Sequence, residues 1–165
     1  MGNLPLPLEG EAGWGCSPAS GDARLCLAPP PQPLPAGEGL NRFAGYAAIF
    51  DRVDRGGDVV RRGAFAGSLA AGVRVPLLWQ HDPGRVIGVV EALSEDRRGL
   101  RVVARVNSRA GALVAARRVT GLSFGYRVKR AAGRNPRALI DVELVEVSLV
   151  ARPMQPLARV IAVGV

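Results

Sequence analysis

Histidine and cysteine are scarce in this chain of 165 residues. His81 is the only histidine, so any chemistry that needs an imidazole must use that residue. The two cysteines, Cys16 and Cys26, have no nearby histidine or second cysteine pair to complete the four ligands of a zinc site. Their spacing would allow a disulfide, although a reducing cytoplasm would keep both as thiols. We therefore expect no metal site.

Long apolar runs are also missing. No stretch approaches the roughly 20 apolar residues that span a bilayer, and the N-terminus lacks the basic start and apolar segment of a secretory signal. We expect a soluble, intracellular protein without a membrane partner. Aromatic residues make up only 5% of the chain. This shortage argues against binding of single-stranded nucleic acid, because such proteins stack bases on aromatic side chains.

Charge and proline are unevenly distributed. Residues 1–40 contain eight of the thirteen prolines and carry a net charge of −3, whereas residues 41–165 carry +11. The first segment has no helical or strand periodicity, so we expect residues 1–40 to form a disordered Pro/Gly-rich tail. Residues 41–165 are long enough for one folded domain. Their basic excess favours an acidic partner, which on charge alone could be nucleic acid, an anionic membrane or an acidic protein segment.

The folded part has the pattern of a mainly β protein. Short apolar runs bounded by glycine, aspartate and arginine predict strands at 43–50, 75–80, 85–93, 99–106, 122–129, 138–150 and 157–163. Asp96-Arg97-Arg98-Gly99 predicts a hairpin turn. Helices are predicted over 63–71 and from Ser108, as the N-cap, through Arg117. Many strands with few short helices favour an α+β fold built on a closed or nearly closed antiparallel β-barrel.

His81 and Ser123 are the candidates for nucleophilic chemistry. His81 ends an apolar run and precedes the turn-forming Asp82-Pro83-Gly84, which places it at the end of a strand. Ser123 lies between apolar and glycine neighbours. A serine needs a base to take its proton as it attacks, and imidazole has a suitable pKa. The alternative is a lone histidine with one hydrogen bond and an ordinary serine in a strand.

A carboxylate would orient the imidazole and stabilise its charged form. One predicted strand offers Asp141, Glu143 and Glu146, and strand alternation puts Glu146 alone on the more apolar face. A carboxylate there needs a partner, either protonated His81 or an arginine in a structural ion pair. Asp82 adjoins His81 but would point to the opposite face, so we expect it to cap the turn.

Two further features could stabilise the oxyanion of an acyl transfer reaction. Backbone N–H groups within 121–125 are natural donors, because glycine lets a chain approach a substrate closely. Arg117 or Arg118 could add positive charge, or could form a solvated basic helix end.

Taken in order, the segments across residues 43–160 resemble the prohead, or capsid maturation, proteases of tailed bacteriophages and gene transfer agents. The segments that carry the resemblance are Phe43-Ala44-Gly45-Tyr46-Ala47 with Phe50-Asp51, Gly57-Asp58-Val59-Val60, Gly63-Ala64-Phe65 with Ser68-Leu69, Leu77-Leu78-Trp79-Gln80-His81-Asp82 with Ile87-Gly88, Gly99-Leu100, Gly121-Leu122-Ser123-Phe124-Gly125-Tyr126, and Leu144-Val145-Glu146-Val147-Ser148-Leu149-Val150 ending at Pro153.

The resemblance implies a serine endopeptidase with a fold similar to herpesvirus assemblin. Its catalytic pair would be Ser123 and His81, with Glu146 as the third member and no cofactor. Its partner would be the major capsid protein, whose scaffolding segment it would cleave inside the immature capsid, in the host cytoplasm, along with itself. Assemblin-like enzymes dimerise, so a homodimer is a further expectation. Two alternatives remain open: a noncatalytic basic β-barrel that binds nucleic acid, and an inactive structural capsid component.

Overall fold

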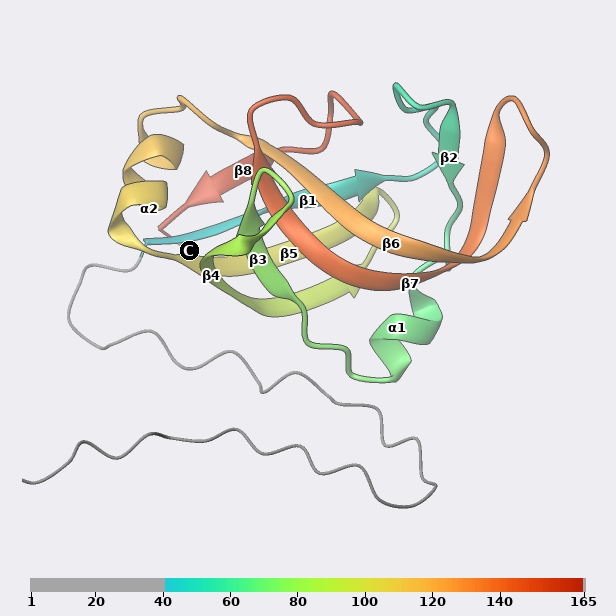
Figure 1. Ribbon diagram of the computed structural model, residues 1–165, viewed down its shortest axis with the longest axis horizontal. Coiled ribbons are helices and arrows are strands. Elements are labelled where there is room, and N and C mark those ends of the chain that lie inside the picture. Colours follow the sequence, from blue (N-terminus) through green and yellow to red (C-terminus); the bar gives the residue numbers. More distant parts are fainter. Residues whose placement is uncertain (1–40, 165) are drawn as a thin grey trace, which may run out of the picture. The chain divides into compact units, whose positions relative to one another are not determined.

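The computed structural model describes residues 41–164, and Figure 1 shows the arrangement of their helices and strands. The predicted tail, residues 1–40, lies outside the described residues, as do both cysteines. In chain order, the elements are β1 (Asn41–Ile49), β2 (Asp58–Val60), α1 (Ala66–Ala70), β3 (Pro76–Trp79), β4 (Asp82–Glu95), β5 (Gly99–Val106), α2 (Ser108–Ala115), β6 (Gly121–Ala132), β7 (Arg137–Val150) and β8 (Val160–Val163). The prediction of a mainly β protein with few short helices is confirmed.

One sheet contains all the strands of the described part. Its order is β2-β7-β3-β4-β5-β1-β8, and β6 pairs with β7. The hairpin between β4 and β5 turns where the sequence predicted. There the Asp96 carboxylate accepts hydrogen bonds from the backbone N–H groups of Arg98 (2.7 Å) and Gly99 (3.1 Å). An aspartate that binds the backbone two residues on is a common way to close a tight turn.

The prediction of an antiparallel barrel needs correction. Both β2 and β3 pair in parallel with β7, so the sheet is mixed. Parallel pairing arises because the chain returns to β7 through long crossover connections and not through a hairpin. Nor is the sheet closed, since β6 does not pair with β8, and its Gly121 meets only Arg159, the residue just before β8, at an isolated bridge. The backbone pairing therefore does not confirm a barrel.

Helix α1 fills a gap on the edge of β7. Strand β2 pairs with the beginning of β7 and β3 with its end, which leaves backbone groups between them unpaired by strands. The buried hydroxyl of Ser68 on α1 donates to the Val142 carbonyl (3.1 Å) and accepts from the Leu144 N–H (3.0 Å). Buried backbone groups must find such partners, so this serine replaces a strand over one step of the ladder.

Strands β6 and β7 have one face in the core and one that carries polar groups. Leu122 is paired with Leu149, and both side chains are fully buried in the apolar core. The next pair along, Ser123 with Ser148, lies on the other face because side chains alternate along a strand. The long β6–β7 ribbon, in Figure 1 the orange and red neighbours, thus holds both serines in fixed register.

Helix α2 begins at Ser108, the residue predicted to be its cap, and so one residue earlier than predicted. The N-cap is Asn107, whose side-chain oxygen accepts from the Ala110 N–H (2.9 Å), and Ser108 is the first helical residue. Asparagine and serine compete for this position, and the residue with extended backbone takes it. Neither helix within residues 41–164 is long and apolar enough to cross a membrane.

Candidate active site

The turn between β3 and β4 holds His81 above β7. Gln80 and His81 have positive φ angles of 54° and 63°, a left-handed conformation that non-glycine residues adopt at a cost on the order of 1 kcal/mol each. Two hydrogen bonds to β7 fix this turn. The Gln80 N–H donates to the Leu149 carbonyl (3.0 Å), and the His81 N–H donates to the Ser148 hydroxyl (3.2 Å). The backbone of the turn is therefore pinned to the strand below it.

The imidazole of His81 is bound to the carboxylate of Glu146. Nδ1 of His81 lies 2.6 Å from Oε1 of Glu146, although the two residues are 65 positions apart in the chain. The His81 side chain is 44% exposed, whereas that of Glu146 is 10% exposed. Because the carboxylate accepts the proton on Nδ1, neutral His81 carries its lone pair on Nε2. Of the two predicted partners for Glu146, the structure shows the histidine.

This contact changes the acidity of His81. The hydrogen bond that Nδ1 donates to Glu146 raises the pKa of the imidazole above its usual 6.5, burial lowers it, and the negative charge of Glu146 raises it further. The carboxylate thus favours the protonated ring. That is the property needed in a group that must accept a proton and hold it for part of a reaction.

Ser148 completes the support of this pair. Its hydroxyl donates to the second carboxylate oxygen of Glu146 (2.5 Å) and accepts from the backbone N–H of His81 (3.2 Å). It is fully buried. Sequence reasoning did not assign it a role. The available signal was its position two residues after Glu146, which puts both side chains on one face of the strand.

Gly125 leaves the space that the Glu146 carboxylate occupies. The two residues are paired across β6 and β7, and a Cβ atom at position 125 would lie 2.6 Å from Oε1 of Glu146. Gly121 likewise approaches the protein's own backbone, since its Cβ would lie 2.5 Å from the Val150 carbonyl oxygen. The sequence interpretation linked these glycines to a bound substrate. In the structure they accommodate neighbouring parts of the chain.

Ser123 lies on β6, two residues before Gly125, and is 5% exposed. Its register opposite Ser148 places it on the face of the β6–β7 pair that carries Glu146. Within residues 41–164 its hydroxyl forms no hydrogen bond with the His81 ring. The structure therefore joins His81 to Glu146 and puts Ser123 on the strand paired with β7, without a hydrogen bond between the serine and the imidazole among residues 41–164.

A cavity of about 240 Å³ adjoins Ser123 and is also lined by Phe124 and Tyr126 of β6. At its wall the Arg137 guanidinium binds both oxygens of the Asp58 carboxylate (2.8 and 2.6 Å), and the Tyr126 hydroxyl donates to the same carboxylate (2.8 Å). The hydrogen bonds from Arg137 lower the pKa of Asp58. Burial, with a smaller contribution from the hydrogen bond to Asp58, raises the pKa of Tyr126 to about 12. The sequence analysis did not identify this cluster.

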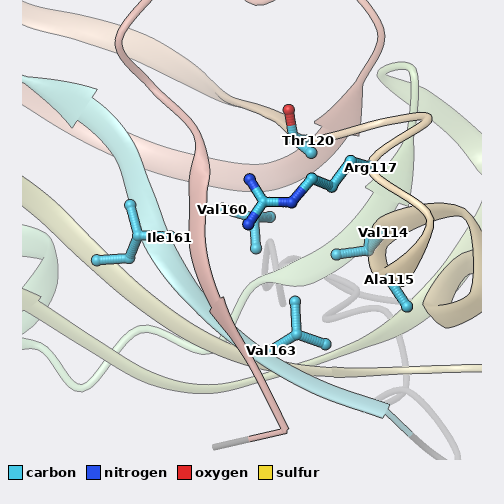
Figure 2. A pocket seen from close by; sticks show the side chains of 7 residues that line it. All are labelled: Val114, Ala115, Arg117, Thr120, Val160, Ile161 and Val163. Atoms are coloured by element: carbon cyan, nitrogen blue, oxygen red, sulfur yellow. The ribbon is translucent and has the colours of Figure 1, made fainter.

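The remaining candidate residues take no part in the contact between His81 and Glu146. Asp82 caps its turn as predicted, since its Oδ1 accepts from the Gly84 N–H (2.9 Å). Arg117 lines a separate cavity of about 300 Å³ between α2 and β8, shown in Figure 2. None of the three predicted catalytic side chains lines that cavity. Among residues 41–164 no group of three or more histidine, cysteine, aspartate or glutamate side chains could hold a metal ion.

Comparison with known proteins gives consistent matches. The family described as caudovirus prohead serine protease matches residues 33–164. The prohead protease of Enterobacteria phage HK97 is 34% identical over 96 residues, which cover 53% of this chain and 43% of that protein. The chain thus spans less than half of the length of this relative.

Among solved structures, the bacteriophage T4 capsid assembly protease superposes with a TM-score of 0.58 at 13% identity, over 68% of this chain and 82% of that one. A protease of Kaposi's sarcoma herpesvirus, crystallised with a hexapeptide phosphonate inhibitor, gives a TM-score of 0.49 at 13% identity, over 78% and 66%. The T4 likeness shows a shared fold, and the family match covers most of the chain, including His81, Ser123 and Glu146. The chain belongs to the caudovirus prohead serine protease family.

Proposed function

We propose that the chain is a serine endopeptidase in which Ser123 is the nucleophile, His81 the general base and Glu146 the group that orients the imidazole. The observation that supports this most is the 2.6 Å contact between the only histidine and a buried glutamate, beside a strand that carries Ser123. A structural ion pair would not require a histidine held in a left-handed turn, and among residues 41–164 nothing forms a hydrogen bond with its Nε2, the nitrogen that would face a substrate.

The proposed reaction is acyl transfer through a covalent intermediate. Ser123 Oγ attacks the scissile carbonyl carbon while Nε2 of His81 takes the hydroxyl proton, and Glu146 stabilises the imidazolium that forms. The imidazolium then gives that proton to the leaving amine as the peptide bond breaks. Water, deprotonated by the same nitrogen, hydrolyses the ester and restores Ser123. In residues 41–164 Oγ and Nε2 form no hydrogen bond, and such contacts often tighten only when substrate is bound.

The proposed substrate is the scaffolding segment of the major capsid protein inside the immature capsid, together with the enzyme itself. Family membership and the likeness to a capsid assembly protease support this assignment. The net charge of +8 would attract acidic segments of a scaffold. A homodimer also stays a prediction.

Coexpression with the cognate capsid protein tests this function. Wild type should shorten the capsid protein, and Ser123→Ala should not. Ser94→Ala, at an exposed serine of β4, is the matched control and should behave as wild type. Equal shortening by wild type and Ser123→Ala would remove Ser123 from the mechanism. No shortening together with salt-sensitive binding to DNA would favour the noncatalytic alternative, and no shortening with incorporation into capsids would favour a structural component.

A further inference from the structure

The cavity beside Ser123 has the size and lining of a pocket for one side chain. Its volume of about 240 Å³ is below the roughly 300 Å³ at which pockets for drug-sized ligands begin. Ala47, Phe124 and Met154 supply apolar surface, and Ser123 itself forms part of the wall. Because Ser123 and Phe124 point to opposite faces of β6 and both line the cavity, it lies at the edge of that strand away from β7. A peptide whose scissile carbonyl lies at Ser123 would have to place a neighbouring side chain over this edge to enter the cavity.

Two of the polar side chains that line the cavity are already fully engaged. Both oxygens of Asp58 are bound by Arg137, which also neutralises the charge of Asp58. Gln155 accepts from the Ile49 N–H (2.5 Å) and donates to the Ile49 carbonyl (3.0 Å). Neither residue has much capacity left to select a substrate by charge.

Asp54 is different. Its Oδ1 accepts from the backbone N–H groups of Gly56 (2.8 Å) and Asp58 (2.9 Å), which builds the turn before β2. Within residues 41–164 its second oxygen, Oδ2, accepts no hydrogen bond, and no arginine or lysine forms a salt bridge with this carboxylate. Asp54 is therefore the uncompensated negative charge on the cavity wall, in a domain whose net charge is strongly positive.

We propose that this cavity is a specificity pocket that takes the lysine or arginine side chain of a substrate residue next to the scissile bond. The apolar stem of such a side chain would pack against Phe124 and Met154, and its charged end would bind Oδ2 of Asp54. This inference rests on the proposed protease function and adds a substrate class to it.

The test is digestion of a proteome-derived peptide library by the purified full chain, with cleavage sites read by mass spectrometry. Wild type should show lysine or arginine enriched at one position beside the cleaved bond. Two synthetic peptides, identical except for lysine or methionine at that position, then give the ratio of their kcat/KM values. A charge-assisted hydrogen bond of this kind should favour lysine by about tenfold or more.

Asp54→Asn keeps Oδ1 for the turn and should reduce the lysine-to-methionine ratio to near one. Asp54→Lys should reverse the preference toward acidic side chains. The ratio is insensitive to partial unfolding, because unfolding lowers both rates equally. Asp51→Asn is the matched control. Asp51 lies on the same loop as Asp54, forms a salt bridge with Arg61 (2.8 Å) and does not line the cavity.

Three outcomes separate this inference from the proposed function. Ser123-dependent cleavage with no basic preference would overturn the pocket and leave the protease intact. A basic preference that Asp54→Asn does not reduce would also overturn the role of Asp54. If no Ser123-dependent cleavage occurs at all, both proposals fail.

Discussion

Replacing Gly125 with alanine should break the contact between His81 and Glu146, although neither of these two residues is changed. The new Cβ would lie 2.6 Å from Oε1 and 2.8 Å from Cγ of Glu146, whereas ordinary contacts begin near 3.4 Å. The carboxylate must therefore move by about 0.8 Å. It cannot do so freely, because Ser148 binds one oxygen and His81 the other.

The expected loss of activity follows from the geometry of the displaced hydrogen bond between His81 and Glu146. A shift of that size carries the 2.6 Å contact between Nδ1 and Oε1 to the limit of the 2.7–3.2 Å range for such bonds or beyond it. Hydrogen bonds to charged groups contribute about 1.5–3 kcal/mol. We therefore expect kcat/KM for Gly125→Ala to fall by roughly 10- to 100-fold.

Two assays check this prediction on the same sample. Peptide cleavage gives kcat/KM, and proton NMR gives the pKa of the imidazole without assignment, because the chain has one histidine. The pKa should fall toward 6.5 as Glu146 withdraws. Gly67→Ala is the control, since its Cβ would meet nothing closer than 3.8 Å. Wild-type activity and an unchanged histidine pKa in Gly125→Ala would refute the reasoning.

Substitutions at three further positions test other parts of the account. In wild type His81 is neutral only above its raised pKa, so kcat/KM should rise with pH through a value above 6.5. Glu146→Gln should move this rise to lower pH and reduce the maximal kcat/KM by about 100-fold. A rise at an unchanged pH would exclude Glu146 as the group that orients the imidazole. The contact between protonated His81 and Glu146 stabilises the fold fully below the ordinary histidine pKa, and this stabilisation is lost as the pH rises through the raised pKa of the folded protein. Glu146→Gln should therefore lower the free energy of unfolding more at pH 5 than at pH 9 in urea titrations. Ser148→Ala should lower kcat/KM and cost about 1–3 kcal/mol of unfolding free energy, and Ser148→Thr should recover part of both if the hydroxyl positions the carboxylate. Ser68→Ala should destabilise the fold by a similar amount without moving the pH profile, since it leaves two backbone groups of β7 unpaired.

Local patterns predicted the elements of this fold better than their pairing. The strand at 99–106 and the Asp96 turn could be found because apolar periodicity and turn chemistry act within a few residues. Strand β2 has only three residues, too few to show alternation. The parallel pairing of β3 with β7 depends on the path of the chain between them, which no local pattern records.

The candidate site was predictable to the extent that residue types are rare. A single histidine left one choice of imidazole, and strand alternation singled out Glu146, which the structure places against it. The contact of Ser148 with the His81 backbone could not be predicted, because it depends on the turn between β3 and β4 lying over β7. The reason for a glycine at position 125 was equally hidden, since it lies in the close approach of a carboxylate from the next strand.

Labelling with a serine-reactive phosphonate tests the account most directly, because the reagent modifies a serine only where a neighbouring base activates it. Intact-mass measurement and peptide mapping of the wild type should show one adduct, on Ser123. The His81→Ala variant should remain unmodified. An unlabelled wild type, an adduct on another serine, or equal labelling of Ser123 in His81→Ala would contradict the central claim.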